Sequence, residues 1–254
     1  MLSACTLLAL NAHGETCSPS TAEPQLLFGD LHVHTSYSLD AYAFGTLTTP
    51  RDASEFARGQ PLRLDNGEII SLDRPLDFAA VTDHAETWEI TWNCTDPVYA
   101  DVPYCSGMRG ERDAGNGRGI FTDYLLPVVT QEPPVHAPFC DTLDFEGATR
   151  SQWRRVQEAA NQAYEPCAFT ALIGYEWTAS PNGRHWHRNV IFRSETVPAR
   201  PFDYITYPSV AKLWSALAEH CRPEEGCDAV AIPHNINWTD GGTFDVENDS
   251  DQVS

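Results

Sequence analysis

Short apolar runs that end in metal-binding residue types recur along the chain. The first run leads into Leu31-His32-Val33-His34, where two histidines stand two positions apart. Side chains at alternate positions of a strand lie on one face, so both imidazoles can reach one point while Leu31 and Val33 face the packing side. Asp40 follows six residues after His34 and adds a carboxylate. This pattern predicts the beginning of a metal site.

Four further apolar runs repeat the arrangement later in the chain. The runs at 78–81, 169–175 and 229–232 lead into His84, Glu176 and His234, and a run at 188–193 is preceded by His185 and His187. Seven nitrogen and oxygen ligands are more than one tetrahedral ion can use. The sequence therefore predicts a cluster of two or three divalent ions, and histidine and carboxylate ligands suit Zn, Mn or Fe.

The apolar pattern predicts one large α/β domain with about five strands, at 26–34, 78–81, 169–176, 188–193 and 228–233. Helices are expected after Thr49, with Pro50 at the first helical position, from a Thr149/Gln152 capping box onward, and around Leu213. The order of strands and helices predicts parallel pairing. In a parallel barrel the carboxyl ends of the strands share one rim, where these ligands would meet.

Residues 88–147 are rich in Gly, Pro, Cys and aromatic residues and show little periodicity. We interpret them as a disulfide-tied insertion that lies over the site. Long segments of this kind often act as functional lids, and an inert clamp that only adds stability is the alternative.

The series of motifs resembles the polymerase and histidinol phosphatase (PHP) superfamily. It consists of His32-x-His34 with Asp40, Thr82-Asp83-His84, Gly174-Tyr175-Glu176, a histidine before a strand, and Pro233-His234-Asn235. More narrowly, the stretches 29–38 and 77–86 resemble its secreted bacterial branch, catalogued as domain of unknown function 3604. The resemblance covers roughly residues 26–240. It implies a distorted (β/α)7 barrel and metal-dependent hydrolysis.

The resemblance also assigns roles to individual residues. The superfamily pattern has one histidine directly before the fourth strand, which favours His187 as the ligand and leaves His185 as a substrate contact or a surface residue. Asp83 is a candidate catalytic residue that orients an imidazole, and Glu86 is a second candidate whose alternative is a solvated side chain. Asp30 could also orient an imidazole, and a purely structural role in a turn is the alternative.

Two features depart from the superfamily pattern. Its members usually close the site with a late Asp-x-His, which does not follow His234 here, and members of the narrower branch are longer. We therefore expect a C-terminally incomplete chain, with an open barrel, a metallohydrolase domain at 23–240 and an acidic tail at 241–254.

The charge of the chain narrows the class of partner. The formal net charge is -20, from 36 acidic and 16 basic residues, and Lys212 is the single lysine. Such a chain repels phosphate backbones and anionic lipids, so nucleic acid is not an expected partner. No apolar run approaches 18 residues, so no membrane span is expected. A small-molecule ester is the expected substrate.

The N-terminal residues and the cysteines indicate that the protein is exported. Residues 1–22 combine a short apolar stretch with Leu2-Ser-Ala-Cys5, which fits a truncated signal or a lipoprotein leader followed by a linker; a disordered terminus is the alternative. Eight cysteines allow many pairings, and proximity in sequence favours Cys94–Cys105, Cys221–Cys227 and Cys140–Cys167. We expect a periplasmic or secreted protein, with a lipid anchor as a further possibility.

The expected function is hydrolysis by a metal-bridging hydroxide, which attacks the phosphorus of a small-molecule phosphate ester. The same platform could serve a sulfate ester or an amide. A truncated metal-binding protein without turnover is the alternative outside the enzymes, because the late Asp-x-His is missing.

Overall fold

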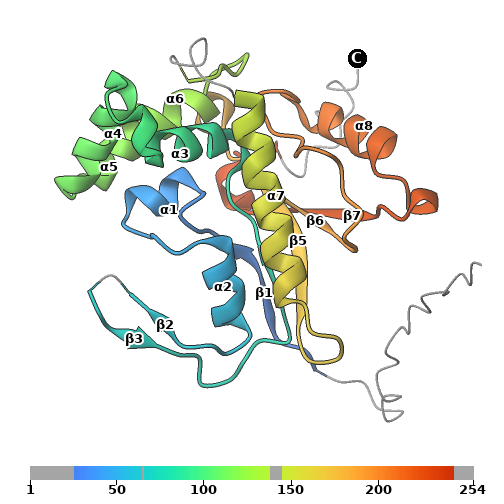
Figure 1. Ribbon diagram of the computed structural model, residues 1–254. Coiled ribbons are helices and arrows are strands. Elements are labelled where there is room, and N and C mark those ends of the chain that lie inside the picture. The colour runs from blue at the N-terminus through green and yellow to red at the C-terminus, as the bar shows by residue number, and fades with distance from the viewer. Residues whose placement is uncertain (1–25, 65, 138–144, 243–254) are drawn as a thin grey trace, which may run out of the picture.

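The computed structural model describes residues 26–64, 66–137 and 145–242. The proposed leader, the acidic tail after residue 242 and Cys140 lie outside these residues. Figure 1 shows a curled half-barrel sheet with helices on its outer side and a group of short helices beyond one end of the strands. The main sheet consists of β1 (Gly29–Val33), β4 (Phe78–Val81), β5 (Thr170–Trp177), β6 (Arg188–Phe192) and β7 (Ala229–Pro233), in this spatial order.

The five predicted strands are all present, but the prediction that they pair in parallel is wrong for β6. The pairs β1–β4 and β4–β5 are parallel, whereas β6 is antiparallel to both β5 and β7. Only residues 178–187 connect β5 to β6, and a parallel crossover needs a dozen or more residues. Because β6 is reversed, its first residue lies at the same rim as the last residues of the other strands.

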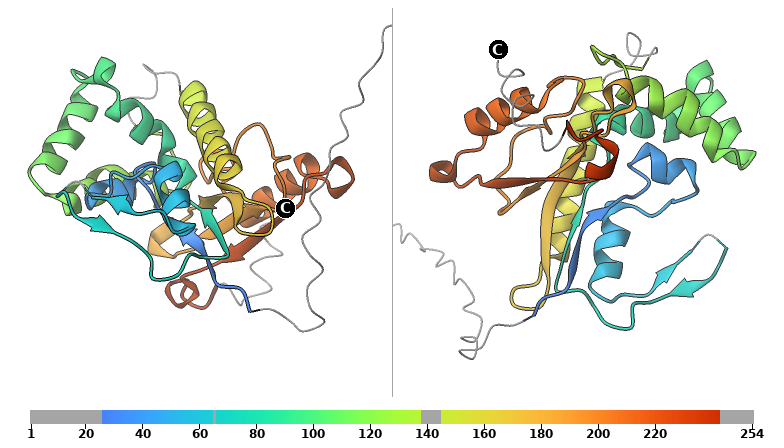
Figure 2. Two further views of the ribbon diagram at one scale, coloured as in Figure 1. Left: turned by 60° about the horizontal axis from the view of Figure 1, so that its bottom comes forward. Right: turned by 180° about the vertical axis from the view of Figure 1, so that it is seen from behind.

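The helix α2 (Pro50–Ala57) begins as the sequence predicts. Thr49 is its N-cap, Pro50 occupies the first position, and Thr49 and Asp52 form a reciprocal capping box. The short strands β2 (Leu62–Arg63) and β3 (Ile69–Ile70) form a separate antiparallel hairpin after it. These elements precede β4 and lie away from the rim (Figures 1 and 2).

The long helix α7 (Phe145–Ala163) covers the outer face of the sheet beside α2 (Figure 1). The predicted capping box is wrong, because Thr149 and Gln152 lie inside this helix. Gln152 is buried, and its Nε2 donates to the carbonyl of Trp88 and to Thr91 Oγ1. The helix α8 (Val210–His220) packs Val210, Leu213 and Leu217 inward, and Ser209 is its N-cap.

Residues 88–137 are largely helical, which the weak periodicity did not indicate. The elements are α3 (Trp88–Thr95), α4 (Pro103–Asp113), α5 (Gly117–Ile120), a π-helical turn (Phe121–Leu125) and α6 (Leu126–Val129). In Figure 2 (right) these helices, coloured green, lie beyond the rim of the sheet. Their buried apolar side chains form a core of their own, separate from the aromatic core between the sheet and α7. The segment is therefore a small helical unit.

Two predicted disulfides are present. Cys94–Cys105 links α3 to α4, and Cys221–Cys227 closes the turn between α8 and β7. Cys167 is also disulfide-bonded, but its predicted partner Cys140 lies outside the described residues. Disulfide bonds of this kind are typical of oxidising compartments and are compatible with export. Within the described part of the chain, no helix has the length and apolar character that crossing a membrane requires.

Candidate metal centre

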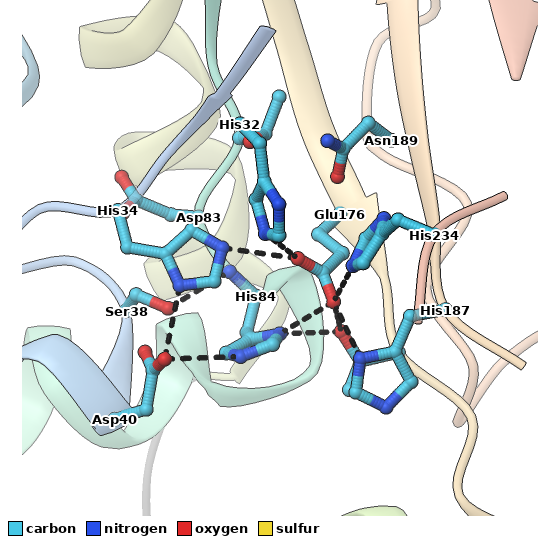
Figure 3. A network of polar contacts seen from close by, with 12 residues as sticks. His32, His34, Ser38, Asp40, Asp83, His84, Glu176, His187, Asn189 and His234 are labelled. Atoms are coloured by element: carbon cyan, nitrogen blue, oxygen red, sulfur yellow. Dashed lines mark hydrogen bonds and ion pairs between the residues drawn. The ribbon is translucent and has the colours of Figure 1, made fainter. Parts of the chain in front are cut away.

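The seven predicted ligands come together at the rim of the sheet (Figure 3). They arrive from six segments: His32 and His34 from the end of β1, Asp40 from the short helix α1 (Leu39–Ala43), His84 after β4, Glu176 near the end of β5, His187 directly before β6, and His234 directly after β7. The rings of His32 and His34 lie with centroids 4.9 Å apart on one side of the strand end. The alternation predicted for this pair is therefore confirmed.

Glu176 is the common contact of this group. Its Oε2 lies 3.2 Å from His32 Nε2 and 3.0 Å from His34 Nε2. Its Oε1 lies 2.8 Å from His187 Nδ1 and 3.3 Å from His234 Nε2. The carboxylate is completely buried, so it depends on these cationic or metal-binding partners for compensation.

Asp40 joins two of the same imidazoles from the opposite side. Its Oδ2 lies 3.0 Å from His34 Nδ1 and 3.4 Å from His84 Nε2, while His84 Nδ1 lies 3.3 Å from Glu176 Oε1. His34 and His84 therefore each bridge between the two carboxylates. Each of these two rings has one nitrogen near Asp40 and the other nitrogen near Glu176. A single hydrogen bond or a single bound ion would need only one of the two nitrogens.

The ligand atoms form three groups that could each hold a metal ion. These are His32–Glu176–His234, His34–Asp40–His84 and His84–Glu176–His187, and within each group the ligand atoms lie within 4.8 Å of one another. Glu176 and His84 belong to two groups each. The three groups therefore adjoin one another through these two shared residues.

The hydrogen bonding of the imidazoles supports metal ligation. Both ring nitrogens of His234 are buried and have no hydrogen-bond partner, although Nε2 lies near Glu176. An unsatisfied buried nitrogen costs on the order of 1–3 kcal/mol, and a bound ion would remove that cost. Five imidazoles around two carboxylates are also a donor set typical of zinc, manganese or iron. The residues present therefore fit a divalent metal.

The electrostatics of the group agree with this fit. Burial raises the pKa of Glu176, but the charge on His84 and hydrogen bonds from His187 hold that pKa well below its usual range. Burial also lowers the pKa of His34, yet hydrogen bonds to Asp40 and Glu176 raise it to about 9. Without an ion, the buried carboxylates therefore require protonated imidazoles. A bound ion would take over this positive charge.

The pKa of His187 shifts in the opposite direction from that of His34. Burial lowers the pKa of His187 to about 4, and the contact with Glu176 is too weak to compensate. The ring is therefore neutral at ordinary pH, which is the form that binds a metal. His185 lines the cavity and stacks on His187 with ring centroids 4.6 Å apart, but it belongs to none of the three groups. The choice of His187 over His185 agrees with this geometry.

Hydroxyl groups that the sequence analysis missed fix the imidazoles. Ser180 Oγ lies 2.8 Å from His187 Nε2, and Thr178 Oγ1 lies 2.5 Å from His84 Nδ1. Outer partners of this type set ring orientation and ligand basicity in metal sites. Thr178 and Ser180 follow Glu176 at alternate positions, so the sequence does contain a signal that they share its side of the chain. Ser and Thr are too common for this pattern alone to predict a role.

The structure does not place Asp83 or Glu86 at the reacting side of the site. Asp83 is buried, and its carboxylate accepts from the backbone nitrogen and the hydroxyl of Thr35, at 2.5 and 2.7 Å. It therefore holds the turn after His34 and does not orient an imidazole. The carboxylate of Glu86 accepts from the backbone nitrogens of Thr178 and Tyr204, at 2.9 and 2.7 Å.

Glu86 is thus neither solvated nor in the cavity. Burial and the nearby Asp203 raise its pKa to about 8, and its hydrogen bonds connect the loop after β5 to the segment around Tyr204. Neither Asp83 nor Glu86 lines the cavity, and their contacts in the described part of the chain are structural ones. Short local motifs do not reveal which way a buried carboxylate points. The catalytic roles of Asp83 and Glu86 remain predictions. Asp30 has the turn role, with its Oδ1 accepting from His32 N.

The ligands line a cavity of about 710 Å³. Apolar side chains of the π-helical turn and α6 also line it, namely Phe121, Leu125, Leu126 and Val129. Asn235 and Trp238 line the mouth, and Trp238 is 59 % exposed. Trp177 and Trp186, which the sequence also places beside ligands, are buried in the core beneath the sheet.

Comparisons with known proteins identify the family but add no activity. No curated protein and no solved structure gives a significant match to the chain. The sequence profile described as "Protein of unknown function (DUF3604)" matches residues 21–254, which include all seven candidate ligands. The chain therefore belongs to the DUF3604 family.

Proposed function

We propose that this protein is a metal-dependent hydrolase of the PHP type that cleaves phosphate esters of small molecules. The observation that carries the proposal is the buried Glu176 carboxylate, which contacts imidazoles from four separate segments at one rim. Divalent ions held there would supply an activated water and would polarise the phosphoryl group. The ordered positions of the ligands at strand ends support the PHP resemblance.

The chain's own residues hold and orient these ions. His32, Glu176 and His234 would hold one position, while His34, Asp40 and His84 would hold another. The third group reuses His84 and Glu176 together with His187. The cavity beside the ligands provides the space for a small substrate.

A second candidate function rests on one specific geometry. Ser180 Oγ, His187 and Glu176 stand in line, with 2.8 Å from Ser180 Oγ to His187 Nε2 and 2.8 Å from His187 Nδ1 to Glu176 Oε1. This order of contacts is that of a Ser–His–Glu relay in acyl transfer. It leaves the other four imidazoles without a role. The backbone N–H of Ser180 could serve as an oxyanion donor, but it already donates a hydrogen bond to Val129 O at 2.8 Å.

Chelation distinguishes the two candidates. The full chain would be purified, analysed for bound metals, and assayed on 4-nitrophenyl phosphate, sulfate and acetate before and after chelation and re-addition of zinc or manganese. We expect bound metal and phosphatase activity that disappears on chelation and returns with the ion. Chelator-resistant esterase activity together with covalent labelling of Ser180 by a fluorophosphonate would favour the relay instead.

A matched pair of histidine variants tests the site itself. His34→Ala should lower the metal content and abolish the metal-dependent activity. His220→Ala removes a half-exposed histidine at the end of α8, outside the cavity, and should change neither. Bound metal without turnover on any ester would indicate a metal-binding protein, and equal metal content in wild type and His34→Ala would contradict the assignment.

A further inference from the structure

The cavity has two chemically different walls. One part of the lining, the ligand wall, carries the candidate metal ligands, and another part, the apolar wall, consists of apolar side chains from the π-helical turn and α6. Leu125 and Val129 are 3 % exposed, so they also belong to the core of the helical segment, while Phe121 and Leu126 are partly exposed. These four side chains offer hydrocarbon to the part of a substrate that lies away from the candidate ligands.

The charges of the lining residues narrow the substrate further. None of the described residues that line the cavity is an arginine or a lysine. Its acidic residues, Asp40 and Glu176, both belong to the ligand groups. A single anionic group would find its counter-charge in the bound ions. A second anionic group on the same substrate would find none, and the net charge of -20 would oppose its entry.

The end of α6 and the two residues that follow Thr130 are hydrogen-bonded to the β5–β6 connection and to the segment before α8. Ser180 N donates to Val129 O at 2.8 Å, and Tyr204 Oη donates to Gln131 O at 3.1 Å. Asn182 Nδ2 donates to Glu132 Oε2 at 3.2 Å. The end of α6 is therefore held to the β5–β6 connection, and the cavity is preformed.

We propose that the cavity selects monoesters whose alcohol part is apolar, such as a benzyl or another aryl-bearing group, and discriminates against polyol and polyanionic esters. This inference rests on the proposed function. In the reaction, a bond forms between the water oxygen and phosphorus while the phosphorus–oxygen bond to the alcohol breaks. The proton of the water passes to the leaving oxygen, so the products are an apolar alcohol and inorganic phosphate.

The test compares esters with the same type of leaving group. Benzyl phosphate and glycerol 3-phosphate are both alkyl monoesters, so a difference between them reports contacts with the alcohol part. With the full chain reconstituted with zinc or manganese, we expect kcat/KM for benzyl phosphate to be about 100-fold higher. A bisphosphate sugar should be cleaved more slowly still. Equal kcat/KM for benzyl phosphate and glycerol 3-phosphate would overturn the proposal.

A variant pair locates the preference on the apolar wall. Leu126→Asp places a carboxylate in the cavity and should reduce the preference for benzyl phosphate at least about tenfold. Val98→Asp makes the same kind of change at a residue that is 80 % exposed in the same helical segment but outside the cavity, and it should leave the preference unchanged. A preference that survives Leu126→Asp in a folded variant would contradict the proposed role of this wall.

Binding of non-hydrolysable analogues separates the two proposals. Calorimetry on the wild-type metal-loaded protein would compare benzylphosphonate with methylphosphonate, and we expect benzylphosphonate to bind at least about tenfold more tightly. Tighter benzylphosphonate binding without turnover of any ester would overturn the proposed hydrolase and support the apolar preference. Equal binding of the two phosphonates would overturn the preference, whatever the activity.

Discussion

The two walls of the cavity are built in opposite ways. The ligand wall collects side chains from six segments between residues 32 and 234, and each segment contributes one or two residues at a strand end or in a short helix. The apolar wall comes from one continuous stretch, Phe121–Val129. The ligand wall is thus fixed by the sheet, and the apolar wall by a single helical segment. Under the proposed function, reaction chemistry and substrate choice would belong to separately built parts of the fold.

The walls also differ in how they are stabilised. The ligand wall buries carboxylates and imidazoles, whose charge must be balanced by protons or metal ions. The apolar wall is stabilised by burial of hydrocarbon and by the Cys94–Cys105 disulfide beneath it. Changes to the ligand wall should therefore act on metal affinity, and changes beneath the apolar wall on stability and selectivity.

The largest effect is expected from Glu176→Gln, because one buried carboxylate contacts five imidazoles and belongs to two ligand groups. The variant keeps the side-chain volume but loses the charge. We expect metal affinity to fall by more than the roughly 10- to 100-fold typical of losing an outer partner, with loss of activity. Elemental analysis after dialysis against a competing chelator measures it. Glu225→Gln, at an exposed residue of the turn after α8, is the control. Unchanged metal content in Glu176→Gln would contradict the role of Glu176 as a ligand shared by two groups.

The next largest effect is expected from removing the Cys94–Cys105 disulfide with the double variant Cys94→Ser, Cys105→Ser. Both cysteines are fully buried in the same core as Leu125 and Val129, so the apolar wall should loosen. We expect the free energy of unfolding in urea to fall by about 2–4 kcal/mol and the preference for benzyl phosphate to decrease.

The Cys221–Cys227 disulfide provides the matched control, because it lies outside that core and outside the cavity lining. Its removal should lower stability and leave the ester preference as in wild type. If both double variants change the preference equally, the two walls are not independent.

A smaller effect is expected from Ser180→Ala. The hydroxyl at 2.8 Å from His187 Nε2 orients this imidazole, and its loss should weaken binding of one ion by about 10- to 100-fold. Titration against a chromogenic chelator measures the affinity. Ser194→Ala, which removes an exposed hydroxyl bonded to Gly226 O, is the control. Unaltered affinity in Ser180→Ala would show that packing alone orients His187.

The smallest effect is expected from Trp238→Ala. This side chain is 59 % exposed at the mouth of the cavity, so it covers only part of a bound substrate. We expect kcat/KM for benzyl phosphate to fall about 2- to 10-fold, with little change for glycerol 3-phosphate. Tyr164→Ala, at an exposed aromatic residue outside the cavity, should change neither value. An equal loss for both esters would assign Trp238 to the ligand wall rather than to selectivity.

The sequence alone predicted the five strands, two of the disulfides and the seven candidate ligands that the fold brings together. These features depend on local patterns: alternation places His32 and His34 on one face, and Cys94 and Cys105 are close in the chain. Histidines and carboxylates in a fixed order are also rare enough to stand out against the background.

Only the tertiary structure decided the rest. The short connection between β5 and β6 reverses β6 and so brings His187 to the rim, which a pattern of alternating elements does not reveal. The directions of Asp83 and Glu86 depend on Thr35, Thr178 and Tyr204, which are distant in sequence. The apolar wall is made of common residue types, and their place in the same cavity as the ligands follows from packing. These features depend on contacts between residues that are distant in the sequence, so a local sequence pattern does not predict them.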